Sequence, residues 1–286
     1  MKSNGYQYQA DSNKAGEINY RKGVAEVEEK NPAQYMDLMK QRMEETVNIF
    51  QRLDEKYRIG INKDMIFGEF GAERAQRVLA LIHRYNLEKG YAFDISPDML
   101  NISRIISENC YKDEYKGKKL PHEKLVLVAD DFLKAKENIQ PQQLDFVFCF
   151  ATIHHFPDPR PVFKTVHSLL KDGGYFYFDR EALKSWLGLH EVARFRTYLR
   201  FGKIIEREYG ILETQFSLKI WKEAFDLFDD WNIRLKYPAP VLEKLYNFDF
   251  KKITGNGLLR FASQVFGGRI YGVLRKGKKL GSNSSI

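Results

Sequence analysis

The stretch that decides the fold is Leu144-Asp145-Phe146-Val147-Phe148-Cys149-Phe150. Six of its seven side chains are apolar, and polar and apolar residues do not alternate along it. A strand that is apolar on both faces is typical of the centre of a parallel sheet covered by helices on both sides. The stretch therefore predicts an α/β fold in which residues 144–150 form a central strand.

Strands and helices alternate along the chain on both sides of this strand. Ser96-Pro97-Asp98 is a helix start signal, with serine at the N-cap and proline at the first helical position. Five strands that alternate with helices imply crossover connections and a doubly wound parallel sheet. Short apolar runs predict the other strands at 65–70, 91–95, 125–129 and 175–178, and helical spacing predicts helices at 74–85, 97–109 and 160–170. Two later strands, at 233–237 and 269–275, complete a Rossmann-like, mostly parallel sheet of seven strands.

The ends of the chain and two interior segments do not follow this alternation of strands and helices. Residues 1–32 are polar without a clear period, which predicts a flexible N-terminal arm, and residues 33–59 have the apolar spacing of an amphipathic helix. The α/β domain is expected over 60–276. Within it we expect a helical cap insertion at 182–215, after strand five, and an irregular insertion at 238–266, followed by a basic and polar tail at 277–286.

The composition narrows the class of protein. The chain has 286 residues, of which 43% are hydrophobic and 29% charged, as in globular proteins. A formal net charge of +8 is modest for this length, so nucleic acid is not the favoured partner. Cys110 and Cys149 form neither a zinc signature nor a redox motif. The polar N-terminus and the lack of a long apolar run predict a cytoplasmic protein without a membrane span. The oligomeric state cannot be predicted from the sequence.

Polar residues gather where four successive strands end. The segments that carry them are 69–73 with two glutamates, Asp94, the pair Asp130 and Asp131, and 151–158 with its two histidines. Ligands of doubly wound sheets bind at the carboxyl ends of the strands. The pattern therefore predicts a nucleotide-like ligand that lies across this edge of the sheet.

The loop after the first strand argues against a dinucleotide. A G-x-G-x-x-G pattern that starts at Gly71 would need glycine at positions 73 and 76, where the chain has Glu73 and Gln76. Those glycines let the backbone approach a pyrophosphate, beside which a glutamate is unfavourable. The loop thus disfavours a nicotinamide oxidoreductase. It favours a ligand without phosphates that bears a sulfonium and an ammonium group, such as S-adenosylmethionine.

Five motifs in this order and spacing resemble the class I S-adenosylmethionine-dependent methyltransferases of the small-molecule type, with a methyltransferase-11-like domain. They are Glu69-Phe70-Gly71-Ala72, Asp94, Ala129-Asp130-Asp131-Phe132, the segment 145–158, and Leu169 to Gly174. No single motif is specific, but the order of all five is. The resemblance covers residues 60–180 well and the last strands loosely, and it implies a methyltransferase-like domain over 60–276 with S-adenosylmethionine as cofactor.

The resemblance also implies contacts for the methionine end of this cofactor. Gly71 and Ala72 would form the turn under the methionine portion, and Glu69 would hold this loop or reach the cofactor's amine. Phe150 and Ala151 would offer backbone groups to the same amine.

For the nucleoside end, the resemblance implies that Asp94, with Ile95 beside it, accepts hydrogen bonds from the ribose hydroxyls. Ser96 already fills the N-cap position of the next helix, which favours this role for Asp94 over capping. Asp130 or Asp131 would accept from the adenine amino group, and Phe132 would lie beside the ring.

The reaction that the resemblance implies is methyl transfer by in-line displacement. His154, His155 and Glu181 are the candidates for a general base, with a loop-supporting role as the alternative for the histidines. Arginines and aromatic residues within 186–213 suggest a small acceptor that is anionic or glycan-like.

One departure from the family pattern bears directly on function. The family's loop has glycine where this chain has Glu73 and Ala75. Glu73 either points away at the helix start, where an acid suits the helix dipole, or crowds the methionine carboxylate. The second arrangement would favour an alternative function, a catalytically inactive binding or scaffold module of the same fold.

Overall fold

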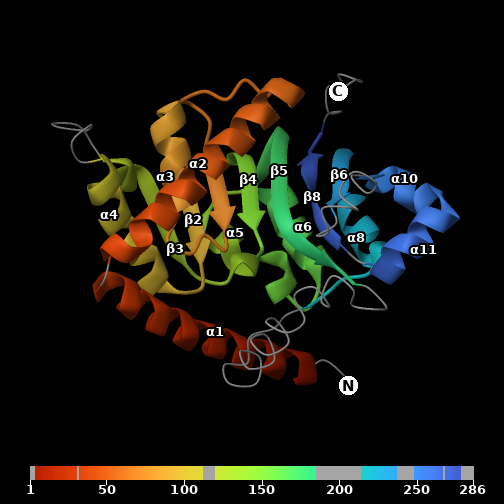
Figure 1. Cartoon of the computed structure of the whole chain (residues 1–286), viewed down its shortest axis with the longest axis horizontal. Coiled ribbons are helices and arrows are strands. Elements are labelled where there is room, and N and C mark those ends of the chain that lie inside the picture. Colours follow the sequence, from red (N-terminus) through yellow and green to blue (C-terminus); the bar gives the residue numbers. More distant parts are fainter. Residues whose placement is uncertain are drawn as a thin grey trace.

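One mixed sheet organises the molecule (Figure 1). The computed structural model describes residues 4–30, 32–111, 120–184, 214–236, 248–266 and 268–277. Within them the strand order is β3-β2-β1-β4-β5-β8-β6-β7. Strands β1 to β5 are parallel, and β8 runs antiparallel to both β5 and β6. The strands are β1 (Phe67–Phe70), β2 (Gly90–Asp94), β3 (Leu125–Ala129), β4 (Leu144–Phe150), β5 (Leu170–Leu183), β6 (Asp230–Lys236), the two-residue β7 (Phe248–Asp249) and β8 (Gly268–Arg275). Without β7 this is the predicted sheet of seven strands.

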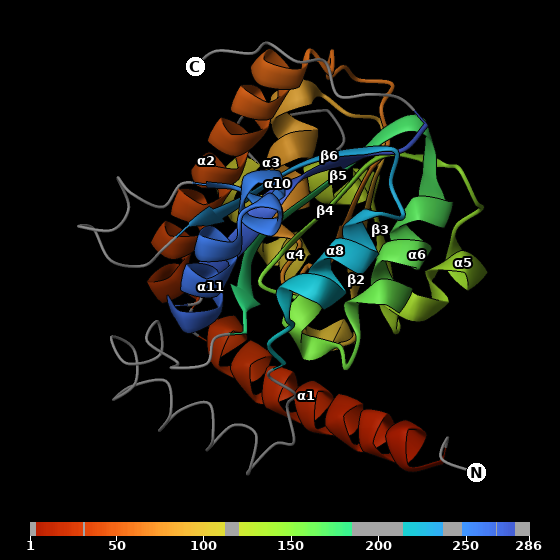
Figure 2. The ribbon, with the colours of Figure 1, turned by 90° about the vertical axis from the view of Figure 1, so that its right-hand side faces the viewer.

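Helices cover both faces of the sheet (Figure 2). One face carries α2 (Pro32–Tyr57), α3 (Gln76–Tyr85) and α4 (Pro97–Tyr111). The other carries α5 (Ala135–Asn138), α6 (Pro159–Leu169) and α8 (Leu218–Phe225). Helices α10 (Phe250–Gly255) and α11 (Gly257–Phe266) follow β7 at the end of the sheet. Three short 3-10 helices are η1 (Pro121–Lys124), η2 (Phe132–Lys134) and η3 (Ile153–His155).

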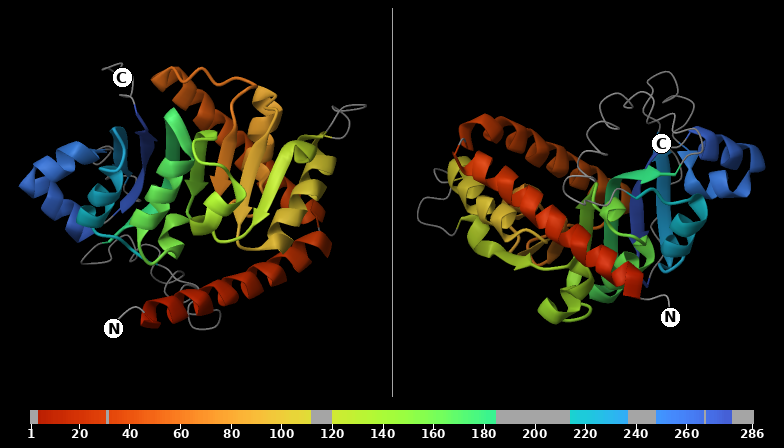
Figure 3. Two further views of the ribbon diagram at one scale, coloured as in Figure 1. Left: turned by 180° about the vertical axis from the view of Figure 1, so that it is seen from behind. Right: turned by 90° about the horizontal axis from the view of Figure 1, so that it is seen from below.

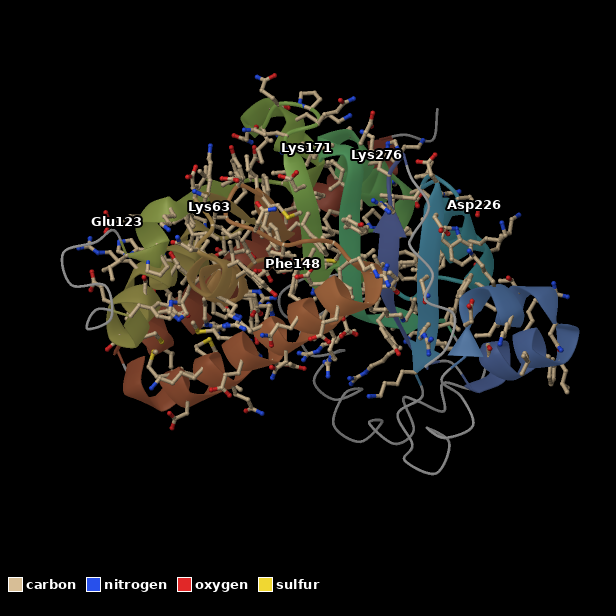
Figure 4. The ribbon with its side chains drawn as sticks, turned by 90° about the horizontal axis from the view of Figure 1, so that it is seen from above. Lys63, Glu123, Phe148, Lys171, Asp226 and Lys276 are labelled. Carbon is tan, nitrogen blue, oxygen red and sulfur yellow. The ribbon has the colours of Figure 1, made fainter. Side chains whose placement is uncertain are left out.

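Strand β4 shows why its sequence is apolar throughout. Phe146 and Phe148 face α2, where their ring centroids lie 4.9 and 5.0 Å from that of Phe50. Val147 and Cys149 point to the opposite face and belong to the core that includes Phe163 of α6. Phe148 is fully buried and lies in the middle of the molecule (Figure 4). Since both faces are covered, an alternating pattern would place polar side chains in a core.

The N-terminal segment is not the flexible arm that its polarity predicted. It forms the helix α1 (Asn4–Lys30), which crosses in front of the carboxyl ends of the strands when the molecule is seen from below (Figure 3). Buried Ala25 packs with a core cluster that includes residues of α4, but Lys14 and Arg21 make ion pairs with loops of the sheet. A search for apolar periodicity misses this helix, because Ala25 is the one buried residue among those of α1 whose burial the structure describes.

Two further expectations need correction. Strand β5 continues to Leu183, into the predicted insertion 182–215, because Glu181 to Leu183 pair with Ile270 to Gly268 of β8. The described part of the predicted irregular insertion 238–266 forms β7, α10 and α11, and Asp249 caps α10 by accepting from the Lys251 N–H at 2.8 Å. The remainder of the predicted helical insertion, 185–213, lies outside the described residues. In the part of the chain that the structure describes, no helix has the length and apolar character needed to cross a membrane.

Candidate functional site

A cavity of about 490 Å³ opens at the carboxyl edge of the sheet, and α1 contributes part of its lining. Its volume lies within the roughly 300–1,000 Å³ that small-molecule sites occupy. The ends of β1, β2, β3, β4 and β5 all contribute to it, together with α1 and α2. Its lining residues are Lys14, Glu17, Arg21, Arg42, Gly71, Glu73, Arg77, Phe93, Asp94, Ile95, Asp130, Asp131, Phe132, Leu133, Phe150, Ala151, Thr152, His155, Phe156, Pro157, Arg180 and Thr214.

The loop after β1 has the backbone of a glycine-rich turn although it contains one glycine. Gly71, Glu73 and Ala75 have φ values of +63°, +50° and +53°, which is the left-handed region. A side chain at position 71 would collide with Thr152, because a Cβ there would lie 2.3 Å from its Oγ1 and Cγ2. Glu73 and Ala75 adopt the same region at a cost of about 1–2 kcal/mol each. The loop thus keeps the shape that glycines at 73 and 75 would adopt freely.

Asp94 joins this loop to the end of β2. Its Oδ2 accepts a hydrogen bond from the Glu73 N–H at 2.8 Å, and its Oδ1 accepts from the Ser96 N–H at 2.9 Å. Burial raises the pKa of Asp94 to about 6, against the opposing effect of these hydrogen bonds and of Arg21. Each carboxylate oxygen can accept two hydrogen bonds. Asp94 therefore fixes the loop and still offers acceptor positions to a ligand in the cavity.

The residues after β3 contribute two carboxylates and an aromatic ring to the cavity. Asp131 caps η2 by accepting from the Leu133 N–H at 3.0 Å, and its other oxygen pairs with Lys14 of α1. Asp130 accepts from the Asp131 N–H at 2.7 Å. The ring of Phe132 stacks on Phe70 with the two planes 15° apart. All three predicted residues, Asp130, Asp131 and Phe132, line the cavity.

Glu69 and Ala72 are fully buried and do not line the cavity, whereas Gly71, Ile95, Phe150 and Ala151 do. Glu69 is fully buried in β1, and its Oε1 accepts from Arg77 Nη1 at 3.0 Å. Burial raises the pKa of Glu69 to about 8 against the charge of Arg77. In this geometry Glu69 positions Arg77, which reaches the cavity.

The three catalytic candidates occupy different positions. Glu181 is fully buried, and its oxygens accept from the backbone N–H groups of Thr152, Ile153 and His154, at 2.7, 2.9 and 3.1 Å. His154 Nδ1 lies 3.0 Å from the same carboxylate. Burial raises the pKa of Glu181, but the charge of His154 and these hydrogen bonds outweigh it, so that the pKa is lowered. His155 lines the cavity, whereas Glu181 and His154 hold the segment from which it projects.

Glu73 lies in a cluster of arginines. Its Oε1 accepts from Arg21 Nη1 of α1 at 2.9 Å, and its Oε2 accepts from Arg42 Nη1 of α2 at 3.2 Å and from Arg74 Nη1 at 3.3 Å. Burial alone would raise the pKa of Glu73, but the surrounding guanidinium charges, including that of Arg77, lower it to about 2. Glu73 is thus ionised at neutral pH and lines the cavity, so it does not point away from it.

Two further guanidinium groups contact one aromatic ring at the end of β4. The Cζ atoms of Arg77 and Arg180 lie 4.7 and 5.7 Å from the ring centroid of Phe150. Arg180 has a φ of +68° at an irregularity in β5, which turns its side chain toward α2, where it pairs with Glu45 at 2.6 Å. This side of the cavity therefore combines positive charge with an aromatic surface.

Sequence reasoning missed the residues that α1 and α2 contribute. Lys14, Glu17 and Arg21 line the cavity from α1, and Arg42 lines it from α2. The first three are spaced at three and four residues, so they share one helix face. This charged face was the sequence feature that could have indicated a helix at the cavity. It is weak evidence, because such spacing is common on solvated helices.

Comparisons with known proteins give a family and a fold. A sequence-family model described as a methyltransferase domain matches residues 33–226. Two solved structures of Haemonchus contortus phosphoethanolamine N-methyltransferase 2, one with S-adenosylmethionine and one with phosphomonomethylethanolamine and S-adenosylhomocysteine, superpose with TM-scores of 0.50 and 0.51. They are 15% and 16% identical to this chain, and each match covers 80% of it.

This chain spans only about half of that protein, since the matches cover 52% of its length. The YcgJ protein of Bacillus subtilis is matched over its full length and 82% of this chain, at 16% identity and a TM-score of 0.49. The comparison with curated protein sequences found no match.

Proposed function

Because the chain belongs to the methyltransferase domain family, we propose that it transfers a methyl group from S-adenosylmethionine to a small anionic acceptor. The observation that carries this proposal is the cavity, in which acidic and aromatic groups from the ends of β1 to β4 lie beside a cluster of arginines. The cofactor supplies an electrophilic methyl group on its sulfonium. The protein has to bind it, orient an acceptor and exclude water.

The cavity residues fit such a cofactor. Gly71 packs so closely against Thr152 that no side chain fits between them, and both residues line the cavity. Asp94 would accept from the ribose hydroxyls, and Asp130 or Asp131 from the adenine amino group, with Phe132 beside the ring. Backbone groups of Phe150 and Ala151 would receive the methionine amine. A hydrogen bond to a charged acceptor contributes roughly 1.5–3 kcal/mol.

The acceptor side is assigned to the arginines around Phe150. Arg77 and Arg180 provide planar guanidinium groups, which bind carboxylates and phosphates through paired hydrogen bonds. A glycan-like acceptor, the other class suggested by the sequence, would depend on residues within 186–213. Holding an acceptor in line with the C–S bond can contribute about 7–11 kcal/mol to lowering the barrier.

His155 is the candidate general base, because it is the histidine of the pair that lines the cavity. A positioned base accelerates such a reaction by about 10²–10⁴ fold. His154 and Glu181 would act as positioning residues that hold the segment 152–155.

Calorimetry with S-adenosylhomocysteine tests the cofactor assignment. We expect binding to the wild-type protein and about tenfold weaker binding to Asp94→Asn, the loss expected when a charged acceptor becomes neutral. Asp98→Asn is the matched control, since Asp98 carries the same charge in the first turn of α4 and lies outside the cavity lining. No heat with either S-adenosylmethionine or S-adenosylhomocysteine would refute the proposal.

That outcome would support the second candidate function, a methyltransferase-like binding or scaffold module without catalysis. The observation that favours this alternative is that Glu73, at a position where the family has glycine, lines the cavity.

A further inference from the structure

The carboxylate of Glu73 is bound as a ligand would be. It is held by guanidinium groups from two separate helices, Arg21 of α1 at 2.9 Å and Arg42 of α2 at 3.2 Å, and all three side chains line the cavity. Each helix provides a donor to a different oxygen of the carboxylate. Guanidinium groups that converge on both oxygens form a strong recognition site for a carboxylate.

An incoming carboxylate would have to compete with Glu73 for the same donors. Arg21, Arg42 and Arg74 contribute three positive charges. Glu73 and Glu17, which lies 3.6 Å from Arg21, contribute two negative charges. The carboxyl of Asp94 also interacts with Arg21, so the protein's own carboxylates balance these positive charges. A second carboxylate is therefore accommodated only when Glu73 leaves its donors.

The position of Glu73 identifies the competing carboxylate. Glu73 belongs to the loop that contains Gly71, and its carboxylate accepts from Arg21 and Arg42, which line the same cavity. Resting on the proposed function, we propose that Arg21 and Arg42 bind the carboxylate of the cofactor's methionine portion, and that Glu73 is an internal carboxylate that occupies this subsite until the cofactor displaces it. Glu73 thereby sets the affinity for the cofactor, and α1 becomes part of the cofactor site.

Two ligands separate this role from a general effect on the cavity. S-adenosylhomocysteine has both the carboxylate and the amine, whereas its decarboxylated analogue, 5′-(3-aminopropylthio)-5′-deoxyadenosine, has only the amine. Binding of both ligands is measured by calorimetry with the full-length wild type and with Glu73→Gln, Arg42→Gln and Glu17→Gln. Glu17→Gln is the matched control, because it also removes one cavity carboxylate near Arg21 but leaves the Arg42 contact of Glu73 in place.

We expect Glu73→Gln to bind S-adenosylhomocysteine at least tenfold more tightly than the wild type does, with a change of less than threefold for the decarboxylated analogue. Arg42→Gln should lower the affinity for S-adenosylhomocysteine and leave the affinity for the decarboxylated analogue unchanged. Glu17→Gln should change the affinity for S-adenosylhomocysteine less than Glu73→Gln does. Melting temperatures of all variants without ligand check that each one folds.

The possible failures are distinguishable. If both ligands bind the wild type and Glu73→Gln changes both equally or neither, the subsite is refuted while the proposed function stands. If no variant binds either ligand, both are refuted. If only Glu73→Gln binds S-adenosylhomocysteine, Glu73 blocks the subsite and the cofactor does not displace it, which refutes both the displacement and the proposed function of the wild type.

Discussion

Replacing Gly71 with alanine tests whether the cavity depends on close approach between the loop after β1 and the end of β4. Gly71 has a φ of +63°, which costs an alanine about 1–2 kcal/mol. The added Cβ would also lie 2.3 Å from Oγ1 and Cγ2 of Thr152 and 2.8 Å from its Cβ, so one of the two segments must move. Overpacking of this kind costs about 1–3 kcal/mol. We expect Gly71→Ala to lower the free energy of unfolding by about 2–5 kcal/mol in total.

Gly60→Ala separates the two contributions. Gly60 has a similar φ of +73°, but a Cβ there would have no atom within 4 Å. It should therefore cost only the conformational term of about 1–2 kcal/mol and leave the cavity unchanged. Urea unfolding gives both free energies, and calorimetry with S-adenosylhomocysteine should show a loss of binding for Gly71→Ala alone.

A third variant locates the collision. Thr152→Ala removes two of the three atoms that a Cβ at position 71 would meet, together with the Thr152 hydrogen bond to the Phe150 carbonyl at 3.0 Å. Measured in the Thr152→Ala background, Gly71→Ala should cost less than it does in the wild type. Equal destabilisation by Gly71→Ala and Gly60→Ala, or a cost at Gly71 that does not depend on Thr152, would refute the reasoning.

Three further predictions follow from the site and the core. Burial raises the pKa of Asp94 to about 6, and the charged form of Asp94 is the better acceptor. The affinity for S-adenosylhomocysteine, measured by calorimetry, should therefore rise about tenfold from pH 5 to pH 7. The affinity of Asp94→Asn should not change over this pH range. Glu181→Gln should lower the free energy of unfolding by about 1–3 kcal/mol for each backbone donor left unpaired. Because the pKa of Glu181 is lowered in the folded protein, this difference from wild type should be complete near neutral pH and shrink as the pH falls below about 4 in urea unfolding series; a constant difference would contradict it. Phe50→Ala should lower the free energy of unfolding by about 3–5 kcal/mol, because this fully buried ring contacts Phe146 and Phe148. Leu38, in the same helix, has a side chain that is 45% exposed, so Leu38→Ala should change the free energy of unfolding by less than about 1 kcal/mol. Thermal unfolding of both variants measures the difference.

The sequence determined the fold and the family. The apolar run at 144–150 and the helices and strands around it predicted a doubly wound sheet, and the order of five motifs predicted a class I S-adenosylmethionine-dependent methyltransferase. The sheet order and the family match confirm both predictions. These features are readable because they depend on local periodicity and on residues that directly follow strands. The roles of individual site residues stay predictions, although Asp94, Asp130 and Asp131 lie where the sequence placed them, at one edge of the sheet.

Only the tertiary structure decided how charges are paired around that edge. Three ion pairs at this edge join residues that are far apart in the sequence. They are Lys14 with Asp131, Arg21 with Glu73, and Arg180 with Glu45, separated by 117, 52 and 135 positions. Nothing in the local sequence of α1 predicts such partners, because a charged residue on a helix has the same pattern whether it faces water or a cavity. Glu181 shows the same limit, because only the tertiary structure reveals that its carboxylate is buried and accepts from three backbone donors. Apolar burial leaves a periodic record in the sequence, whereas an ion pair between distant segments leaves none, and that difference explains why the fold was predictable and the arginine cluster around Glu73 was not.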